Sequence, residues 1–391
     1  MQIQKCYQSK ARGKRALPGA LAILFILCAL LASEAAAARK KVLFIAGHPS
    51  HSNGEHEFRA GCMLLAKAIN DSGLDIEAVV HSYDWPKDES IFEGVDAVVI
   101  YADAGGPIRN KLTFLDEKVK AGMGIMFMHY GVHPPKQIGQ DYFLDWIGGY
   151  FETGWSVNPH WIADLAPKAN HPVGNGIDKP VKAYDEFYFN MRFPTDCDEC
   201  YPLVTASPQP DRMVRYINLW NEHGDAAFGK PQALMWCRDP KSGGRGIGFT
   251  GGHYHKNWAI DDFRKLALNS IVLLARGEVP ATGVPSQPLT QEHLNANLDR
   301  PKPGEVLPLP DGSELTQKPM ARPQDPANYG RKGKTKPKAS KAKKKARKSN
   351  KAKAAAPDAA SPQAWTRPLL SSDKERLVQV ELMVKGLKEI Y

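Results

Sequence analysis

Residues 41–58 carry the pattern that decides the fold, KVLFIAGHPSHSNGEHEF. The first six residues, 41–46, form an apolar run of the length typical of a buried strand. A loop rich in glycine, serine and histidine follows at 47–57. Apolar residues then recur at the spacing of one helical face over 55–72. The segment therefore predicts a strand, a loop and a helix, in that order.

The same alternation of strands and helices continues along the chain. Apolar runs without polar alternation predict strands that are buried on both faces, as in parallel sheets. Beyond Gly148 the pattern loosens, and we expect antiparallel or irregular pieces there. The expected strands are 75–80, 97–101, 125–128, 232–237 and 246–250, the looser pieces include 181–189 and 203–206, and the helices are 112–121 and 262–275. The sequence thus predicts an α/β fold, with a mostly parallel sheet and helices on both faces.

Composition divides the chain into a globular unit and several extensions. We assign residues 39–280 to the globular domain and 281–330 to a Pro-rich arm that lies over the domain or forms a partly ordered linker. Residues 331–368 predict a Lys/Ala-rich disordered linker. Residues 369–391 predict a short amphipathic helix, which is too short to fold alone and so docks elsewhere or self-associates.

The net charge of +10 is unevenly distributed. Residues 331–353 hold 13 of the 52 Lys and Arg residues and no acid, and residues 1–38 hold five against one Glu. The rest of the chain is acidic, with 34 basic against 41 acidic residues. The basic segment is therefore a polycation attached to an acidic domain. We expect it to bind an anionic cell-surface polymer; the alternative is a merely solvated linker.

The N-terminal residues 1–38 have the three parts of a secretory signal peptide. Basic residues come first, an apolar stretch follows at 21–31, and alanines occupy 35–38. The apolar stretch is short for a membrane span. We therefore expect cleavage near Ala38, no permanent membrane span, and an exported protein that is periplasmic or secreted.

Four cysteines would remain after such cleavage: Cys62, Cys197, Cys200 and Cys237. An oxidising compartment permits disulfides among them, in three possible connectivities. At Cys197 and Cys200 we expect a local disulfide or two idle thiols rather than a zinc site, because no second pair of this spacing exists. We expect Cys62 to pack in a helix.

Histidines gather at the ends of the predicted strands. In a parallel α/β sheet, ligands bind outside the carboxyl ends of the strands. Seven of the twelve histidines fall at these positions, namely His48, His51, His56, His129, His133, His253 and His255. Together they predict a polar cleft, although for any single histidine a hydrogen bond that stabilises a loop is an equal alternative.

Two kinds of chemistry fit this cleft. Neutral imidazoles with a carboxylate such as Glu186 or Asp103 could ligate a divalent metal, zinc or manganese. Alternatively, His129 and Glu186 act as a metal-free general acid and base on a polar substrate. An aromatic side chain such as Tyr130 or Trp155 could stack on a sugar ring. The Gly-rich loop lacks both the dinucleotide glycine spacing and the Walker lysine, so we expect no nucleotide.

Four motifs occur in a specific order. They are Gly47-His48…Ser52-x-Gly54-x-His56-Glu57-Phe58, the strand that ends in His129, His171-Pro172-Val173…Gly176-Ile177 leading to Asp185-Glu186-Phe187-Tyr188, and Gly244-Arg245-Gly246…Gly252-His253. With this order and spacing, residues 42–277 resemble the ThuA-like (trehalose-utilisation) family. The resemblance implies the fold of class I glutamine amidotransferases, which is a flavodoxin-like sheet.

In that wider fold, the turn after the fourth strand carries a nucleophilic cysteine within a Gly-x-Cys-x-Gly motif. The corresponding run here is Phe127-Met128-His129-Tyr130-Gly131, so His129 stands where the cysteine would be. Glutaminase chemistry through a thiolate is therefore excluded at this position. The resemblance implies carbohydrate utilisation instead, with sugars or keto sugars as substrates and with His129, Glu186 and His253 in a shared pocket.

Within this hypothesis the candidate residues fall into three groups. The catalytic candidates are His129, Glu186 and Asp103; the substrate-binding candidates are His48, His56, Tyr130, Trp155, Tyr188 and His255; and the possible metal ligands are His48, His129, Glu186 and His253.

The function we predict is an exported ThuA-like protein that acts on a sugar or keto-sugar derivative. Its His/Glu chemistry, with or without a metal, would be hydrolysis, lyase chemistry or isomerisation. The alternative is a non-catalytic carbohydrate-binding or scaffold module, retained at the cell surface by the basic segment. We do not expect nucleic-acid binding, because it rests only on the basic segment and conflicts with the export signal.

Overall fold

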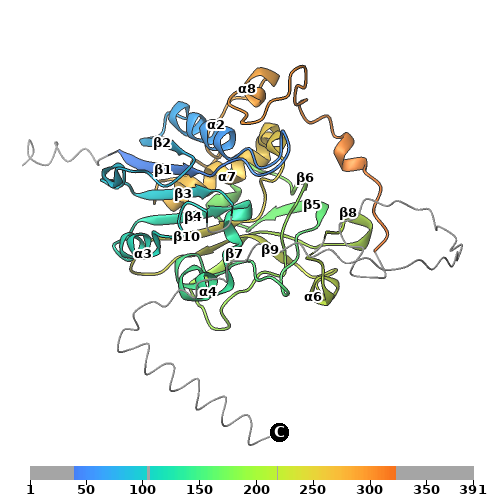
Figure 1. Ribbon diagram of the computed structural model, residues 1–391, viewed down its shortest axis with the longest axis horizontal. Helices are drawn as coiled ribbons and strands as arrows, with labels where there is room; N and C mark the ends of the chain where they lie inside the picture. The colour runs from blue at the N-terminus through green and yellow to red at the C-terminus, as the bar shows by residue number, and fades with distance from the viewer. Residues whose placement is uncertain (1–38, 104–105, 218, 323–391) are drawn as a thin grey trace, which may run out of the picture. The chain divides into compact units, whose positions relative to one another are not determined.

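A mixed sheet of ten strands runs through the part of the chain that the computed structural model describes, residues 39–103, 106–217 and 219–322 (Figure 1). The strand order is β2-β1-β3-β4-β10-β9-β7-β5-β6, and β8 pairs with β5. The strands are β1 (Lys40–Ala46), β2 (Ile76–Ser82), β3 (Ala97–Tyr101), β4 (Gly124–Met128), β5 (His160–Pro167), β6 (Val181–Asp185), β7 (Cys200–Ala206), β8 (Met213–Arg215), β9 (Gln232–Arg238) and β10 (Gly246–Phe249).

The sheet has a parallel half and an antiparallel half. Strands β2, β1, β3, β4 and β10 are parallel to one another. From β10 onward every pairing, through β9, β7, β5, β6 and β8, is antiparallel. The predicted α/β fold is confirmed, and the antiparallel pieces expected beyond Gly148 extend the same sheet.

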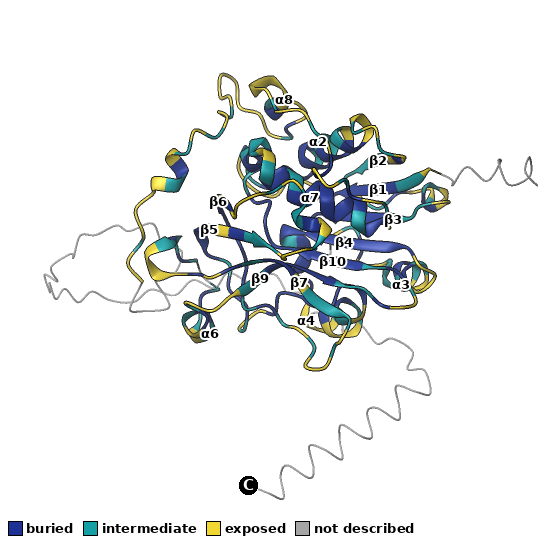
Figure 2. Ribbon diagram, turned by 180° about the vertical axis from the view of Figure 1, so that it is seen from behind, coloured by how far each residue is buried: buried dark blue, intermediate teal, exposed yellow. Residues whose placement is uncertain are grey.

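Helices cover both faces of the parallel half. In β1, Val42 and Phe44 belong to the core cluster beneath α2 and α7, whereas Leu43 and Ile45 belong to a second cluster with α3. This double burial explains why β1 is apolar without alternation; the buried centre is dark blue in Figure 2. The helices are α2 (Phe58–Asp71), α3 (Leu112–Lys120), α4 (Lys136–Ile138), α5 (Leu144–Trp146), α6 (Glu222–Ala226), α7 (Asp261–Leu274) and α8 (Gln291–Asn295).

The first helix begins later than its apolar pattern predicts. It starts at Phe58 rather than at residue 55, because His56 has a φ of 51° and so lies outside the helical region. The Glu57 carboxylate accepts a hydrogen bond from the Gly54 backbone N–H at 3.0 Å. These two features keep residues 54–57 in the loop, and the loop turns His56 toward the sheet.

The predicted strand 181–189 is shorter in the structure, where β6 ends at Asp185. The Asp185 carboxylate accepts hydrogen bonds from the backbone N–H groups of Gly252 at 2.8 Å, His253 at 3.1 Å and Tyr254 at 3.2 Å. These contacts join the end of β6 to the loop that follows β10. The chain then leaves the ladder, so that Glu186 stands free of β-sheet pairing.

Residues 281–322 lie against the globular unit. Val284 and Leu294 are fully buried. The Arg300 guanidinium donates to the carbonyl oxygens of Pro49 at 2.7 Å and His51 at 3.1 Å, and the Asp299 N–H donates to Glu57 at 2.9 Å. This part of the Pro-rich arm therefore fixes the loop 47–57.

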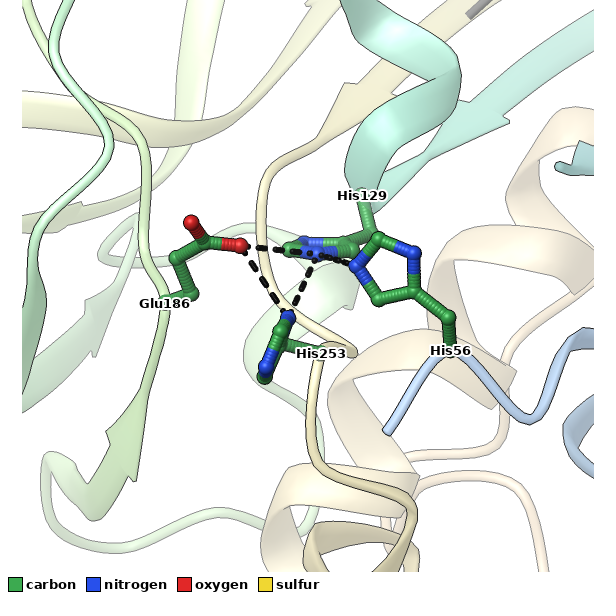
Figure 3. A group of neighbouring side chains, drawn as sticks. All are labelled: His56, His129, Glu186 and His253. Atoms are coloured by element: carbon green, nitrogen blue, oxygen red, sulfur yellow. Dashed lines mark hydrogen bonds and ion pairs between the residues drawn. The ribbon is translucent and has the colours of Figure 1, made fainter. Parts of the chain in front are cut away.

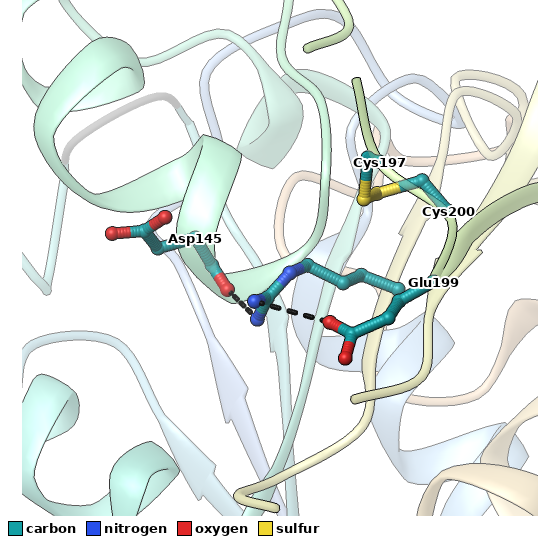
Figure 4. The surroundings of a disulfide bond; sticks show 5 residues. Asp145, Cys197, Glu199 and Cys200 are labelled. Atoms are coloured by element: carbon teal, nitrogen blue, oxygen red, sulfur yellow. Dashed lines mark hydrogen bonds and ion pairs between the residues drawn. A yellow bond between two sulfur atoms is a disulfide. The ribbon is translucent and has the colours of Figure 1, made fainter. Parts of the chain in front are cut away.

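Cys197 and Cys200 form a disulfide where β7 begins, as Figure 4 shows. Beside it, the Arg238 guanidinium donates to the Asp145 carbonyl and lies 3.4 Å from Glu199. Cys62, in α2, and Cys237 are buried free thiols. The sequence is compatible with either a local disulfide or two idle thiols at Cys197 and Cys200, and in the structure the two form the disulfide.

The predicted signal peptide 1–38, the basic segment 331–353 within the linker 331–368, and the C-terminal helix 369–391 lie outside the described residues. Among the residues that are described, no helix is both long and apolar enough to cross a membrane.

Candidate functional site

Four buried side chains converge at the carboxyl edge of the parallel strands (Figure 3). His129 follows β4, His253 follows β10, Glu186 follows β6, and His56 precedes α2. One nitrogen or oxygen atom from each lies within 4.8 Å of those from the other three. We call these four residues the His/Glu cluster.

The shortest distances in the cluster centre on His129 Nε2. This atom lies 3.0 Å from His56 Nε2, 3.3 Å from His253 Nδ1 and 3.3 Å from Glu186 Oε2. His253 Nδ1 is also 3.0 Å from Glu186 Oε2. In tetrahedral zinc sites with ligands at 2.0–2.1 Å, neighbouring ligand atoms are about 3.3 Å apart. The cluster therefore has the donor types and the spacing that could hold a divalent metal ion.

Hydrogen bonds outside the cluster orient two of the imidazoles. His129 Nδ1–H donates to the Thr250 carbonyl at 2.9 Å, which leaves the lone pair on Nε2 to face the cluster. His56 Nδ1 lies 2.9 Å from Ser50 Oγ and 3.3 Å from Asp103 Oδ1. Partners of this kind fix the ring orientation and tautomer of metal-binding histidines.

The backbone aims these two rings through unusual dihedral angles. His56 has a φ of 51° and His129 a φ of 50°, both in the left-handed region that non-glycine residues seldom adopt. His129 begins a short 3-10 turn, His129–Val132, directly after β4. The tight turn after the buried strand directs the ring toward the cluster instead of into the sheet. Such local strain is typical of functional sites.

The cluster holds a strong internal ion pair. Burial opposes ionisation of Glu186, but the charge of His253 and hydrogen bonds with His129 and His253 hold the pKa of this carboxyl well below its usual value. Burial likewise disfavours the charged form of His253, but Glu186 and the Glu55 carboxylate, 3.8 Å from Nε2, raise its pKa to about 9. Burial also lowers the pKa of His56, so that ring is neutral at pH 7.

A cavity of about 700 Å³ opens over the cluster. Its walls combine titratable and aromatic groups from both halves of the sheet with two aliphatic side chains. They are His51, Glu55, His56, Tyr130, His133, Asn158, His160, Glu186, Tyr188, Arg215, Ile217, Leu219 and His253. A cavity of this size accommodates a small polar molecule.

Other residues singled out in the sequence fall inside or near the cavity. Tyr130 and Tyr188 line it, and the Tyr188 hydroxyl lies 3.3 Å from His129 Nε2. Burial raises the pKa of Tyr188 well above its usual value, so this hydroxyl stays protonated. Asp103 approaches the cluster through His56 Nδ1 and Ser50 rather than through its centre.

Three of the singled-out residues lie elsewhere. His48 Nε2 bonds to Asp84 at 3.0 Å, and the His48 side chain is 63% exposed, outside the cluster. His255 is buried and bonds to the Leu294 carbonyl at 3.1 Å, so its ring holds the arm. Trp155 packs against the Arg192 guanidinium.

The family model of ThuA, described as trehalose utilisation, matches residues 41–273. The chain belongs to the ThuA family. No relative was found among the curated proteins. The matched range contains all four members of the His/Glu cluster, so the cluster lies within the ThuA domain.

Solved structures similar to the ThuA domain include two putative ThuA-like proteins. The one from Bacteroides uniformis ATCC 8492 is 16% identical, with a TM-score of 0.44, over 62% of this chain and 91% of that protein. The one from Parabacteroides merdae ATCC 43184 is 19% identical, with a TM-score of 0.43, over 63% and 97%. A glutamine amidotransferase from Methylobacillus flagellatus is 11% identical, with a TM-score of 0.31, over 69% and 100%.

The ThuA domain also brings in polar residues that the sequence analysis did not select. Asn158 donates to Glu186 Oε1 at 3.0 Å, and His160 Nε2 lies 3.8 Å from the same oxygen. Arg215 lines the cavity nearby. Polar residues that follow predicted strands indicated the site, whereas His160 begins the antiparallel strand β5. The sequence signal for these residues is their position, because the polar Asn158 and His160 come just before the apolar run Trp161-Ile162-Ala163.

We expect metal binding to displace a proton from His253. With a pKa of about 9, His253 is protonated at pH 7, and its Nδ1 must be deprotonated to act as a ligand. About one proton should therefore be released per metal ion at pH 7, and the release should diminish as the pH rises through about 9. Calorimetry in buffers of different ionisation enthalpy measures this number.

The exposed His48 provides the matched control, since H48Q should leave the proton release unchanged. Metal binding at pH 7 without proton release would contradict the proposed ion pair between His253 and Glu186.

Proposed function

We propose that this ThuA protein is a metal-assisted enzyme that acts on a sugar or keto-sugar derivative by hydrolysis, lyase chemistry or isomerisation. The observation that carries the proposal is the convergence of three imidazoles and one carboxylate in a buried cluster at the base of a cavity. Membership of a family described as trehalose utilisation supports the carbohydrate substrate class.

Zinc suits the cluster better than manganese does. Three imidazole nitrogens and one carboxylate oxygen form a typical zinc ligand set, whereas manganese favours sites richer in oxygen. When bound, such an ion polarises a carbonyl or lowers the pKa of water. His56, His129, Glu186 and His253 would hold it.

The side chains around the cluster have distinct tasks in this proposal. Asn158 orients the second carboxylate oxygen of Glu186. The protonated Tyr188 hydroxyl donates a hydrogen bond toward a substrate oxygen. His160, whose Nδ1 bonds to the Tyr254 hydroxyl at 2.9 Å, has a pKa lowered by burial to about 3 and is neutral at pH 7. In the tautomer that donates Nδ1–H to the Tyr254 hydroxyl, its Nε2 can accept a hydrogen bond from a substrate hydroxyl.

Metal analysis and a substrate screen test this function on the purified full chain. We expect close to one zinc or manganese ion per chain, and turnover of a member of a panel of sugars and 3-keto sugars that chelation abolishes. H129A removes a ligand and E186Q replaces an anionic ligand by a neutral amide, so each should lower turnover by at least about 100-fold, the upper end of the loss caused by outer-shell changes. H48A, an equivalent change outside the cluster, should retain both metal and turnover.

Two results would contradict the proposal. A metal-free protein that binds sugars but turns none over would favour the non-catalytic carbohydrate-binding module. Full activity of H129A on an identified substrate would exclude His129 from the chemistry.

We also propose that the protein is exported and that residues 331–353 retain it at a surface. The signal-like composition of residues 1–38 supports export, and so does the Cys197–Cys200 disulfide, because disulfides persist in oxidising compartments. The 13 Lys and Arg residues of 331–353 support attraction to an anionic cell-surface polymer.

Deletion of 331–353 should reduce retention on an anionic polysaccharide matrix and flatten its salt dependence, while turnover stays unchanged. Salt elution of the full chain and the deletion variant measures this effect. A variant of equal length, with these Lys and Arg residues replaced by Gln, separates charge from length. Unchanged retention in both variants, or loss of turnover, would contradict the proposed separation of segment and domain.

A further inference from the structure

Arg215 lies in the wall of the cavity above the His/Glu cluster. It ends β8, and its register partner in the antiparallel pairing of β8 with β5 is His160. Directly opposed residues of an antiparallel pair project their side chains from the same face, with Cβ atoms about 5 Å apart. Arg215 therefore stands beside His160, whose Nε2 is 3.8 Å from Glu186, and both line the cavity.

The Arg215 guanidinium lacks a partner among the described residues. Its Nε is buried without a hydrogen bond, and no described carboxylate forms a salt bridge with it. Asn158 Oδ1 and His253 Nε2, in the same cavity wall, are also buried without hydrogen bonds. Arg215 is half-buried as a whole, and its buried Nε is a charged donor whose missing hydrogen bond a ligand could supply. The cavity thus presents a cationic donor to whatever binds there.

The fixed charges of the cavity wall indicate the net charge of the ligand. Arg215 is the single Lys or Arg among the described residues that line the cavity, and Glu55 and Glu186 are the two carboxylates. A divalent ion in the cluster would bring these fixed charges to a net +1. A ligand with one negative charge neutralises that sum, whereas a phosphate dianion exceeds it. A guanidinium also matches the planar geometry of a carboxylate through two parallel hydrogen bonds.

We propose that the substrate is an acidic sugar derivative whose carboxylate binds to Arg215 while its hydroxyl or carbonyl oxygens face the His/Glu cluster. This inference rests on the proposed function and specifies its substrate class. Ile217 and Leu219, which follow β8, contribute an apolar wall to the same cavity. Exclusion of water by such a wall strengthens a charged hydrogen bond.

The test compares three probes by calorimetry with the zinc-loaded full chain: glucuronate, glucose and glucose 6-phosphate. We expect glucuronate to bind more tightly than either of the others. In R215Q its affinity should fall roughly 10- to 100-fold, which is the typical loss when a hydrogen bond between charged groups is removed. Glucose affinity should change little, and R215K should retain part of the glucuronate preference.

Arg212 supplies a matched control, since it lies three residues earlier, outside the cavity lining, with its guanidinium 3.9 Å from Asp164. R212Q should leave glucuronate affinity unchanged. Metal content is measured in every sample, so that failure of the cluster is recognised separately. A metal-free wild-type protein would overturn the proposed function.

With metal present, three results would overturn the inference alone. They are equal or absent binding of glucuronate and glucose, tighter binding of glucose 6-phosphate than of glucuronate, and undiminished glucuronate affinity in R215Q.

Discussion

The geometry of the site depends on one buried carboxylate, that of Asp185. It accepts hydrogen bonds from three consecutive backbone N–H groups, of Gly252, His253 and Tyr254, and also from the N–H of Glu186. The acceptor is fully buried, so each N–H left unpaired by its loss would cost about 1–3 kcal/mol. Gly252 has a φ of 110°, which a side chain would disfavour, and this conformation lets the loop curl around the carboxylate.

Through Asp185, the two halves of the sheet position one another. The parallel half supplies His129 and His253 at its strand ends, and the loop after β1 supplies His56. The antiparallel half supplies Glu186, His160 and Arg215. The imidazoles thus belong mostly to the parallel half, and the residues assigned to substrate recognition mostly to the antiparallel half.

The parallel half could be predicted from sequence because its signals are local. Strands buried on both faces are continuous apolar runs, and their carboxyl ends share one edge of the sheet, so His129 and His253 were placed correctly relative to each other. The same reasoning put His48 beside them, but a loop of eleven residues lets His48 turn outward to Asp84 while His56 turns inward. Side-chain direction within such a loop depends on backbone dihedrals that periodicity does not encode.

The antiparallel half was harder to predict for a physical reason. Antiparallel neighbours bring opposite ends of strands to the same edge. At the start of β5, Trp161 therefore pairs with Asp185 at the end of β6, and His160 pairs with Arg215 at the end of β8. A search for polar residues after strands cannot find a residue before one. Glu186 was found because it lies in a polar run that flanks a predicted strand and belongs to the motif Asp185-Glu186-Phe187-Tyr188, although β6 itself ends at Asp185.

X-ray absorption spectroscopy on the purified, metal-loaded chain examines the His/Glu cluster without reference to a substrate. The proposed centre predicts three imidazole nitrogens and one carboxylate oxygen at about 2.0–2.2 Å from the metal, with loss of imidazole scattering in H253A. A metal whose first shell contains only oxygen atoms, or whose spectrum is unchanged in H253A, would show that the cluster is not a metal centre.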